Sequence, residues 1–315
     1  MIIIAGENVA DLIPASVSVP DSASDSTSAS AAEPALLRLT VGGGPANTAV
    51  AAARLGADVS FAARFGSDAP GRAFRARLTE AGVDLRHAVT LPNPSSLALV
   101  SIDATGAAAY DFWLAGAADF TATALPPVQP EDIQHIGSLA AYWPPGADVI
   151  EDWAGRRSPA TVTLDVNLRP IVLASQPDAV ERLGRLVRNA DVVKASDEDL
   201  RLAYPYADPE VTARGWLEAG PSIIVITLGA RGALGLARDG HRVLVPAPAI
   251  DVADTIGAGD AAMGALLTRL VATGIGGVAE DLDATLRFVV ATAALACTKP
   301  GAYAPSLAEV TSMIA

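Results

Sequence analysis

A glycine-rich turn reads Asp254-Thr255-Ile256-Gly257-Ala258-Gly259-Asp260-Ala261, and it opens a run rich in Ala and Leu that predicts a helix ending near Gly274. Glycines at the start of a helix let backbone N–H groups approach an anion without obstruction by a Cβ atom. The helix dipole also favours negative charge at this end. The turn therefore predicts a phosphate-binding site at the amides of Gly257, Ala258 and Gly259.

Asp260 is an unusual residue for such a site, because a carboxylate repels an anion unless it has another task. A hydroxyl that attacks a phosphoryl group must lose its proton, and a positioned carboxylate that accepts it contributes about 10²- to 10⁴-fold in rate. The alternative is an aspartate that only complements the helix dipole. Asp260 is thus a candidate general base.

A second glycine-rich turn, Gly42-Gly43-Gly44-Pro45-Ala46-Asn47, precedes an Ala-rich run that ends at Gly56. Pro45 suits the first position of a helix, and Gly56 suits the position just past its end. Asn47 then lies in the first turn, where its amide can offer a donor and an acceptor to sugar hydroxyls; local capping is the alternative. These glycines do not form Gly-x-Gly-x-x-Gly, and Gly-x-x-x-x-Gly-Lys-Ser/Thr is absent, so nucleotide binding must rest on other elements.

The rest of the chain alternates short apolar runs with amphipathic helical patterns. The apolar runs are residues 2–5, 59–63, 161–166, 192–193, 223–228 and 232–237. Buried strands that alternate with helices predict a doubly wound, mostly parallel sheet with helices on both faces.

A small β appendage interrupts this rhythm. Residues 97–102 and 108–113 flank a turn signal and predict an antiparallel hairpin added to the main sheet, joined by strands near 11–13 and 36–40. We expect these segments, about 11–41 and 95–115, to form a lid. Residues 15–35, rich in Ser and without aromatics, predict a mobile surface insertion, with a phosphorylation site as the alternative.

Composition limits the classes of partner. The chain of 315 residues has 22 Lys and Arg against 35 Asp and Glu, a net charge of −13, which opposes binding to nucleic acid or an acidic membrane. One cysteine, Cys297, and three scattered histidines exclude an internal disulfide framework and a cysteine or histidine zinc cluster. We see no signal-peptide pattern and no apolar stretch of about 18 residues, so we expect a soluble cytoplasmic protein.

The two glycine-rich turns, in this order and at this separation, resemble the signatures of the ribokinase/PfkB family of carbohydrate kinases. The resemblance covers nearly the whole chain except residues 15–35. It implies a three-layer αβα fold with a small β-sheet lid. It also implies that Gly42, Gly43 and Asn47 contact the sugar, as does Asp11, expected at the end of the first strand.

Two further motifs carry the resemblance. The turn after the predicted strand at 223–226 resembles the nucleotide-binding turn, in which Thr227, Gly229 and Gly232 line the ATP phosphates. Residues 165–170 end another strand and resemble the Asp-x-Asn-x-Arg of fructokinases and 2-keto-3-deoxygluconate kinases. This implies that Asn167 contacts substrate and that Arg169 stabilises the transferring phosphoryl group or contacts the substrate; a salt bridge at a helix start is the alternative.

The resemblance also implies two metal sites. Residues 194–199 are similar to an Asn-x-x-Glu motif that organises Mg²⁺ around the phosphates, with Ser196 in place of Asn and Asp199 in place of Glu; an ordinary acidic helix start is the alternative. The loop 296–302 is similar to one whose carbonyls, with Asp254, bind a monovalent cation such as K⁺. Asp254, Ala296 and Gly301 are the candidate residues.

The sequence thus predicts a kinase that uses ATP and Mg²⁺ to phosphorylate a sugar hydroxyl, with K⁺ as a further cofactor. Fructokinase-like motifs favour a ketohexose such as fructose, with 2-keto-3-deoxygluconate and ribose as alternatives. A homodimer formed through the lid is expected from the apolar faces of the extra strands. The alternative from another class is a silent sugar- or nucleotide-binding sensor, against which the intact Asp260 and its glycines argue.

Overall fold

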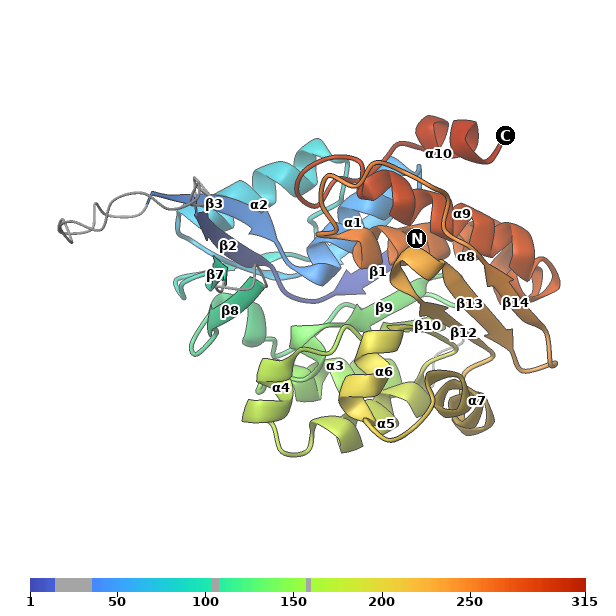
Figure 1. Cartoon of the computed structure of the whole chain (residues 1–315). Helices are drawn as coiled ribbons and strands as arrows, with labels where there is room; N and C mark the ends of the chain where they lie inside the picture. Colours follow the sequence, from blue (N-terminus) through green and yellow to red (C-terminus); the bar gives the residue numbers. More distant parts are fainter. Residues whose placement is uncertain (15–35, 103–107, 157–159) are drawn as a thin grey trace, which may run out of the picture.

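Eight strands pair into one sheet at the centre of the computed structural model, which describes residues 1–14, 36–102, 108–156 and 160–315 (Figure 1). In sheet order they are β14 (Arg242–Val245), β13 (Ala233–Ala237), β12 (Ile223–Thr227), β11 (Val192–Ser196), β10 (Thr161–Asp165), β9 (Ile133–Gly137), β1 (Ile2–Ala5) and β4 (Val59–Ala62). The strands from β12 to β4 pair in parallel, whereas β13 and β14 run antiparallel at one edge. The predicted doubly wound, mostly parallel sheet is confirmed.

Helices cover both faces of this sheet (Figure 1). One layer contains α1 (Gly44–Arg54), α2 (Ala69–Glu80), α8 (Ala258–Glu280), α9 (Leu282–Ala296) and α10 (Leu307–Ile314). The other contains α3 (Gly146–Gly155), α4 (Pro170–Ser175), α5 (Ala179–Asn189), α6 (Asp197–Ala203) and α7 (Pro209–Ala219). Short 3₁₀ turns are η1 (Ala118–Phe120), η2 (Leu139–Ala141) and η3 (Gly229–Arg231).

The hydrophobic residues of the strands divide between two cores because successive side chains of a strand point to opposite faces. In β1, Ile2 and Ile4 lie in the core under α1, α8 and α9, while Ile3 and Ala5 lie in the core under α3 to α7. All four side chains are buried. Continuous apolar strands are therefore what a sheet covered on both faces requires.

A separate four-stranded sheet contains β3 (Leu37–Gly42), β2 (Val9–Pro14), β7 (Ser96–Ile102) and β8 (Ala108–Trp113), in that order. The predicted hairpin is present as β7 and β8, but it does not extend the main sheet. The chain leaves the main sheet after β1 and starts β2 only three residues later, so β7 pairs with β2 instead. The turn at 103–106 and the insertion at 15–35 lie outside the described residues. A short pair, β5 (Arg64–Gly66) and β6 (Val89–Leu91), forms a third sheet.

Helix α8 has 23 residues and, by length and composition alone, is apolar enough to cross a membrane. Half of its apolar window is buried inside the protein, as in the core helix of a soluble fold. Its backbone is also non-helical at Gly274, with φ 67° and ψ 176°, so the regular helix that starts at Ala258 ends where the sequence predicts. Beyond this kink the chain continues as a second helical segment.

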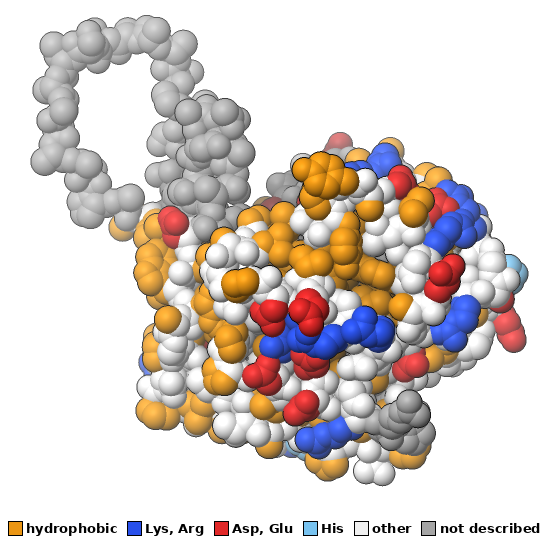
Figure 2. Space-filling view, turned by 90° about the horizontal axis from the view of Figure 1, so that it is seen from below, with side chains coloured by type: hydrophobic (Ala, Val, Ile, Leu, Met, Phe, Trp, Pro, Cys, Tyr) orange, Lys and Arg blue, Asp and Glu red, His pale blue; other side chains and the backbone are white. Residues whose placement is uncertain are grey.

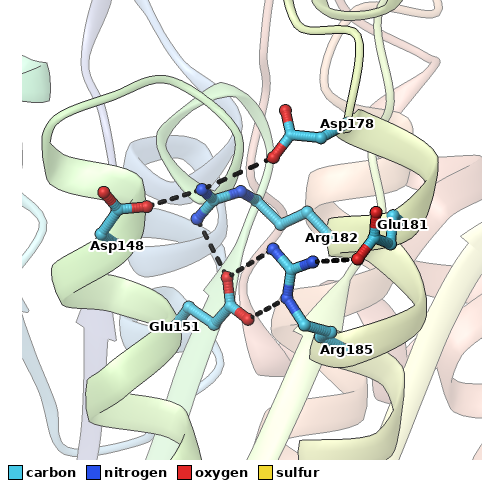
Figure 3. A network of polar contacts seen from close by, with 6 residues as sticks. All are labelled: Asp148, Glu151, Asp178, Glu181, Arg182 and Arg185. Atoms are coloured by element: carbon cyan, nitrogen blue, oxygen red, sulfur yellow. Dashed lines mark hydrogen bonds and ion pairs between the residues drawn. The ribbon is translucent and has the colours of Figure 1, made fainter.

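An ion-pair network joins α3 to α5 (Figure 3). Glu151 accepts hydrogen bonds from both Arg182 and Arg185, and Arg182 also pairs with Asp148 at 2.6 Å. Figure 2 looks onto the side of the molecule where α5 lies, and there basic side chains lie next to acidic ones. The arginines of this network are therefore neutralised by α3 and α5 and do not form a basic surface.

Candidate active site

The two glycine-rich turns meet at the carboxyl ends of the parallel strands. Each turn opens a helix, α1 at Gly44 and α8 at Ala258, and these two helices pack against each other. In doubly wound sheets this edge is where ligands bind, especially beside the strand at which the chain reverses its direction across the sheet. Here that strand is β1, which has β4 on one side and β9 on the other.

Asp260 lies in the first turn of α8 and is buried. The Asn47 Nδ2 atom of α1 donates to its Oδ2 atom at 2.8 Å, and the Thr48 hydroxyl donates to its main-chain carbonyl at 3.4 Å. Burial raises the pKa of the Asp260 carboxyl, opposed by the Asn47 hydrogen bond and by the positive charges of Lys194, Arg169 and Arg77. A carboxyl whose pKa is raised is a stronger base once ionised.

The amides of Gly257 to Gly259 start α8 as predicted. Gly257 is the N-cap in a left-handed conformation with φ 76°, which a residue without Cβ adopts freely. A Cβ atom there would also lie 2.8 Å from the Ala302 side chain, so only glycine fits. The helix itself supplies no partner for its first N–H groups, which suits an anion, although the Ala258 amide donates to the Thr255 carbonyl at 3.3 Å in this structure.

Lys194 was given no role by the sequence analysis, yet it lies beneath this anion site. Its Nζ atom is buried and lies 2.8 Å from both carboxylate oxygens of Asp165, on the neighbouring strand β10. A Cβ atom placed on Gly259 would lie 3.4 Å from the same Nζ. Burial raises the pKa of Asp165 to about 6 against the effect of Lys194. The pair places one cation directly below the Gly257–Gly259 turn.

The candidate sugar side of the site, as implied by the family resemblance, is a group of polar side chains around Gly44. A Cβ atom there would lie 2.5 Å from Asn167 Nδ2, 3.1 Å from Ser138 Oγ and 3.3 Å from Asp260 Oδ1. Asn167 Nδ2 also donates to Ser138 Oγ at 3.2 Å. Three polar side chains, from the loops after β9 and β10 and from α8, thus converge at one point, beside the carboxylate oxygen that Asn47 does not hold.

Ser138 and Asn167 have φ values of 56° and 37°, positive values that non-glycine residues rarely adopt. Strain of this kind persists only where surrounding contacts hold it, and it is concentrated at functional sites. Here the contacts include Glu7, a buried residue that bonds the Ser138 side chain and accepts a hydrogen bond from the Ala140 amide at 2.9 Å. Burial raises the pKa of Glu7 to about 7.

Asp11 corrects one expectation. It lies within β2, in the small sheet, and not at the end of the first strand, which ends at Ala5. Its carboxylate nonetheless faces the site, since a Cβ on Gly42 would lie 2.6 Å from Asp11 Oδ2. Burial raises the pKa of Asp11 to about 6, opposed by the charge of Arg169 and reinforced by Asp260.

Arg169 is exposed at the start of α4 and forms no ion pair within 4.0 Å with any described residue. Its charge still acts on both Asp11 and Asp260. The guanidinium therefore remains available to a substrate or a phosphoryl group.

Gly43, with φ 96°, would bring a Cβ within 2.9 Å of the backbone at Asn8 and Val9, so it packs the α1 turn against the start of the small sheet.

The candidate nucleotide residues lie along the same edge. Thr227 ends β12, Gly229 is the first residue of η3 and Gly232 follows its last, with φ values of 57° and 98° for the two glycines. Ser196 is the N-cap of α6, where its hydroxyl accepts from the Asp199 amide at 2.9 Å. The two residues form a capping box, since Asp199 Oδ2 accepts from the Ser196 amide at 2.8 Å.

Asp199 fits an indirect metal role better than a direct one. Its Oδ1 also accepts from the Leu168 amide at 2.8 Å, so both carboxylate oxygens already hold backbone donors. Over the parts of the chain that the structure describes, no three His, Cys, Asp or Glu side chains are grouped as a metal cage. Mg²⁺ keeps several waters and binds through phosphates with one or two carboxylates, which suits this arrangement.

The candidate monovalent cation residues come from two adjoining loops. Asp254 Oδ2 accepts from the Gly301 amide at 2.8 Å, and the Ala253 and Asp254 amides donate to the carbonyl of Cys297. Ala296, the last residue of α9, precedes that carbonyl directly. Asp254 Oδ1 also accepts from the Ile256 amide at 3.0 Å, so both of its carboxylate oxygens hold a backbone donor, as in Asp199. The main-chain carbonyls of Ala296 and Gly301 are therefore the candidate oxygen donors for K⁺, and Asp254 holds their loop in place.

The comparisons with known proteins agree with this geometry. A family model described as pfkB family carbohydrate kinase matches residues 2–309. A curated fructokinase from Rhizobium leguminosarum bv. trifolii is 33% identical over 233 residues, which cover 73% of this chain and 71% of that protein.

Two solved structures match nearly the whole chain. A fructokinase double mutant from Vibrio cholerae O395, in a form with fructose, ADP and potassium ion bound, has a TM-score of 0.86 at 27% identity and covers 100% of this chain and 98% of that one. A fructokinase from Xylella fastidiosa with bound ATP has a TM-score of 0.83 at 28% identity, over 99% and 98% of the two chains.

Proposed function

This chain belongs to the pfkB family of carbohydrate kinases, and from that premise we propose that it transfers the γ-phosphoryl group of ATP to a hydroxyl of fructose. The observation that carries the proposal is the position of Asp260. One carboxylate oxygen is held by Asn47, and the other lies beside the polar group of Gly44, Ser138 and Asn167. The same helix turn carries the anion-binding amides of Gly257 to Gly259.

The reaction then follows from these positions. A sugar hydroxyl at Gly44 gives its proton to Asp260 Oδ1 while its oxygen attacks the γ-phosphorus. The bond from the γ-phosphorus to the β,γ-bridging oxygen breaks, and its electrons leave with ADP. The amides of Gly257 to Gly259 and the charges of Lys194 and Arg169 stabilise the negative charge on the transferring group.

Mg²⁺ supplies neutralisation of the phosphate charge when it is bound with ATP. Asp199 would hold its water shell, and Thr227, Gly229 and Gly232 would line the phosphates. Asp254, Ala296 and Gly301 would hold K⁺ next to Gly257. A cation bound there would stabilise the N-terminal turn of α8, because Gly257 of that turn packs on Ala302 of the loop 296–302.

Fructose is favoured over an acidic sugar by charge. Recognition of a carboxylate, as in 2-keto-3-deoxygluconate, calls for a cation beside the sugar, and residues 91–120 contain no Lys or Arg. Arg169, whose charge acts on Asp11 and Asp260, is the candidate cation for such a substrate. The relatives named fructokinase support the same choice.

The small sheet would act as the lid. It places Asp11 and Gly42 over the sugar side of the site, and closing it would exclude water that otherwise hydrolyses ATP. Its strands expose Leu37, Leu39 and Trp113, which are 44, 43 and 54% accessible. Exposed apolar side chains on a lid support a homodimer formed through it, and light scattering at micromolar concentration tests this. The match to the pfkB family of carbohydrate kinases supports the expected cytoplasmic location.

The deciding experiment is ADP release from ATP with Mg²⁺ and K⁺, measured with fructose, ribose, 2-keto-3-deoxygluconate, a nucleoside and no sugar. We expect strong turnover on fructose and little without sugar. Turnover on another member of the panel would reassign the substrate. ATP binding without ADP release on any sugar would favour the sensor alternative.

A further inference from the structure

One arginine joins three separate parts of the site without entering it. Arg77 lies in the last turn of α2, and its Nη1 atom donates to the Val41 carbonyl of β3 at 3.2 Å and to Asn47 Oδ1 at 2.8 Å. Its Nη2 atom donates to the Ala302 carbonyl at 3.4 Å, in the loop on which Gly257 packs. A single planar guanidinium thus contacts the lid, the sugar-side helix and the C-terminal loop.

These contacts decide which way the Asn47 amide points. Arginine has only N–H donors, so the Asn47 atom that faces it must be the oxygen. The Asn47 nitrogen then faces Asp260 and donates to its Oδ2. An amide turned by 180° would set its nitrogen against the guanidinium and its oxygen against the carboxylate, so both contacts would become repulsive.

The orientation passes on to the base. Because Oδ2 of Asp260 is taken by Asn47, Oδ1 remains as the oxygen beside Gly44, where the sugar hydroxyl must be. Arg77 therefore orients Asn47, Asn47 orients Asp260, and Asp260 presents one oxygen to the substrate.

The positive charges near Asp260 also stabilise its ionised form. The charged groups around Asp260 are Lys194 of β11, Arg169 at the start of α4 and Arg77 of α2, together with the carboxyls of Asp11 and Asp165. Arg77 is one of three cations that favour the ionised base. Burial lowers the pKa of Arg77, and the charge of Asp260 opposes this. Each of the two groups therefore stabilises the charged form of the other.

We propose that Arg77 is a positioning residue that couples the lid strand β3 to the orientation of the catalytic base through Asn47. It touches no reacting atom. Movement of β3 at Val41 shifts the guanidinium, and the guanidinium sets the amide that holds Asp260. The inference rests on the kinase activity proposed above but not on the identity of the sugar.

The test compares Arg77→Met, Arg77→Lys and the control Arg72→Met. Arg72 is on the same helix, is exposed and, among the described residues, its guanidinium bonds the Ser67 carbonyl just before α2, so its loss reports the cost of removing an α2 arginine. We expect Arg77→Met to lower kcat about 10- to 100-fold, in line with a misplaced catalytic group. Arg72→Met should leave kcat unchanged.

Two readouts separate positioning from stability. In Arg77→Met the acidic limb of the kcat/KM profile should move to higher pH, because loss of a cation raises the pKa of Asp260; Arg77→Lys should restore that limb but not kcat. Asn47→Ala alone should lower kcat through the same loss of orientation, so that adding Arg77→Met lowers kcat little further. Independent losses that multiply in the double variant would overturn the proposal, as would a lower Tm with unchanged kcat and pH profile.

A substrate-free arm keeps this test apart from the proposed function. The carboxyl carbon of Asp260, assigned with Asp260→Asn, can be titrated by NMR in the wild type and in both methionine variants. A raised Asp260 pKa in Arg77→Met, but not in Arg72→Met, is expected even if no sugar of the panel is phosphorylated. An unchanged Asp260 pKa would contradict the coupling.

Discussion

The side-chain amide of Asn47 donates to Oδ2 of Asp260, 213 residues away in the sequence, at 2.8 Å and so joins the first turns of α1 and α8. This hydrogen bond holds one carboxylate oxygen, and in the proposed mechanism the other, Oδ1 beside Gly44, takes the proton of the substrate. Asp260→Asn keeps an oxygen that can accept from Asn47 but removes the ability to take a proton. We expect kcat to fall about 10²- to 10⁴-fold with ATP affinity unchanged. A loss of less than about tenfold would contradict the assignment of Asp260 as the base.

The next prediction concerns Gly44, around which the polar groups of the sugar side are packed. Gly44→Ala would bring a Cβ to 2.5 Å from Asn167 Nδ2, so Asn167 and Ser138 must move. We expect kcat/KM for the sugar to fall at least tenfold while KM for ATP changes little. Gly215→Ala in α7 is the matched control, since nothing lies within 4 Å of its added Cβ. Equal effects of the two substitutions would argue against a sugar site at Gly44.

Lys194 and Asp165 form a buried pair whose two members can be separated by experiment. Lys194→Met leaves Asp165 buried without its cation, and breaking such a pair costs about 3–5 kcal/mol of folding free energy. Adding Asp165→Asn should restore much of this stability, as measured by urea unfolding. Turnover should stay low in the double variant, because no cation then lies beneath Gly259. Recovery of both folding stability and turnover in the double variant would assign the pair a purely structural role.

Glu7 predicts a pH dependence of stability. Its pKa is raised from an ordinary 4.5 to about 7, so between these values the unfolded chain releases a proton that the folded protein retains. The contribution of Glu7 to the free energy of unfolding is therefore fully present below pH 4.5. It decreases by on the order of 3 kcal/mol as the pH rises through 7. Glu7→Gln removes this loss. Unfolding by urea at pH 5 and pH 8 should show the variant gaining on the wild type at the higher pH, and a constant difference would contradict it.

The elements that sequence could predict are those whose signal is local. Strand β1 was predicted at its observed bounds because four consecutive apolar residues are buried on both faces. The start of α8 followed from glycines next to an Ala-rich run, whereas Pro45 was the expected first residue of α1, which begins one residue earlier at Gly44. Strand β9 was missed because it contains Gln134 and His135, polar residues that are buried through bonds to Trp153 and Thr163.

The part of the site that escaped prediction depends on tertiary contacts. Arg77 looks like an ordinary helix residue, and its partners are 30, 36 and 225 residues away in the sequence. Lys194 stood inside a recognised motif, but its pairing with Asp165 arises only from the parallel register of β10 and β11, in which these two residues are opposite each other. Asp11 was placed on the wrong strand because the chain leaves the main sheet after only four residues of β1.

The order of the helices along the chain has a consequence for synthesis. The sugar-side turn at Gly42 to Asn47 and the small sheet are complete before residue 115 is translated, whereas Asp260 and its anion-binding turn come from the last fifth of the chain. In the proposed mechanism an incomplete nascent chain would therefore hold some acceptor-binding groups but no group that activates the acceptor. Phosphoryl transfer, and the wasteful consumption of ATP by an unfinished kinase, would then await nearly complete translation.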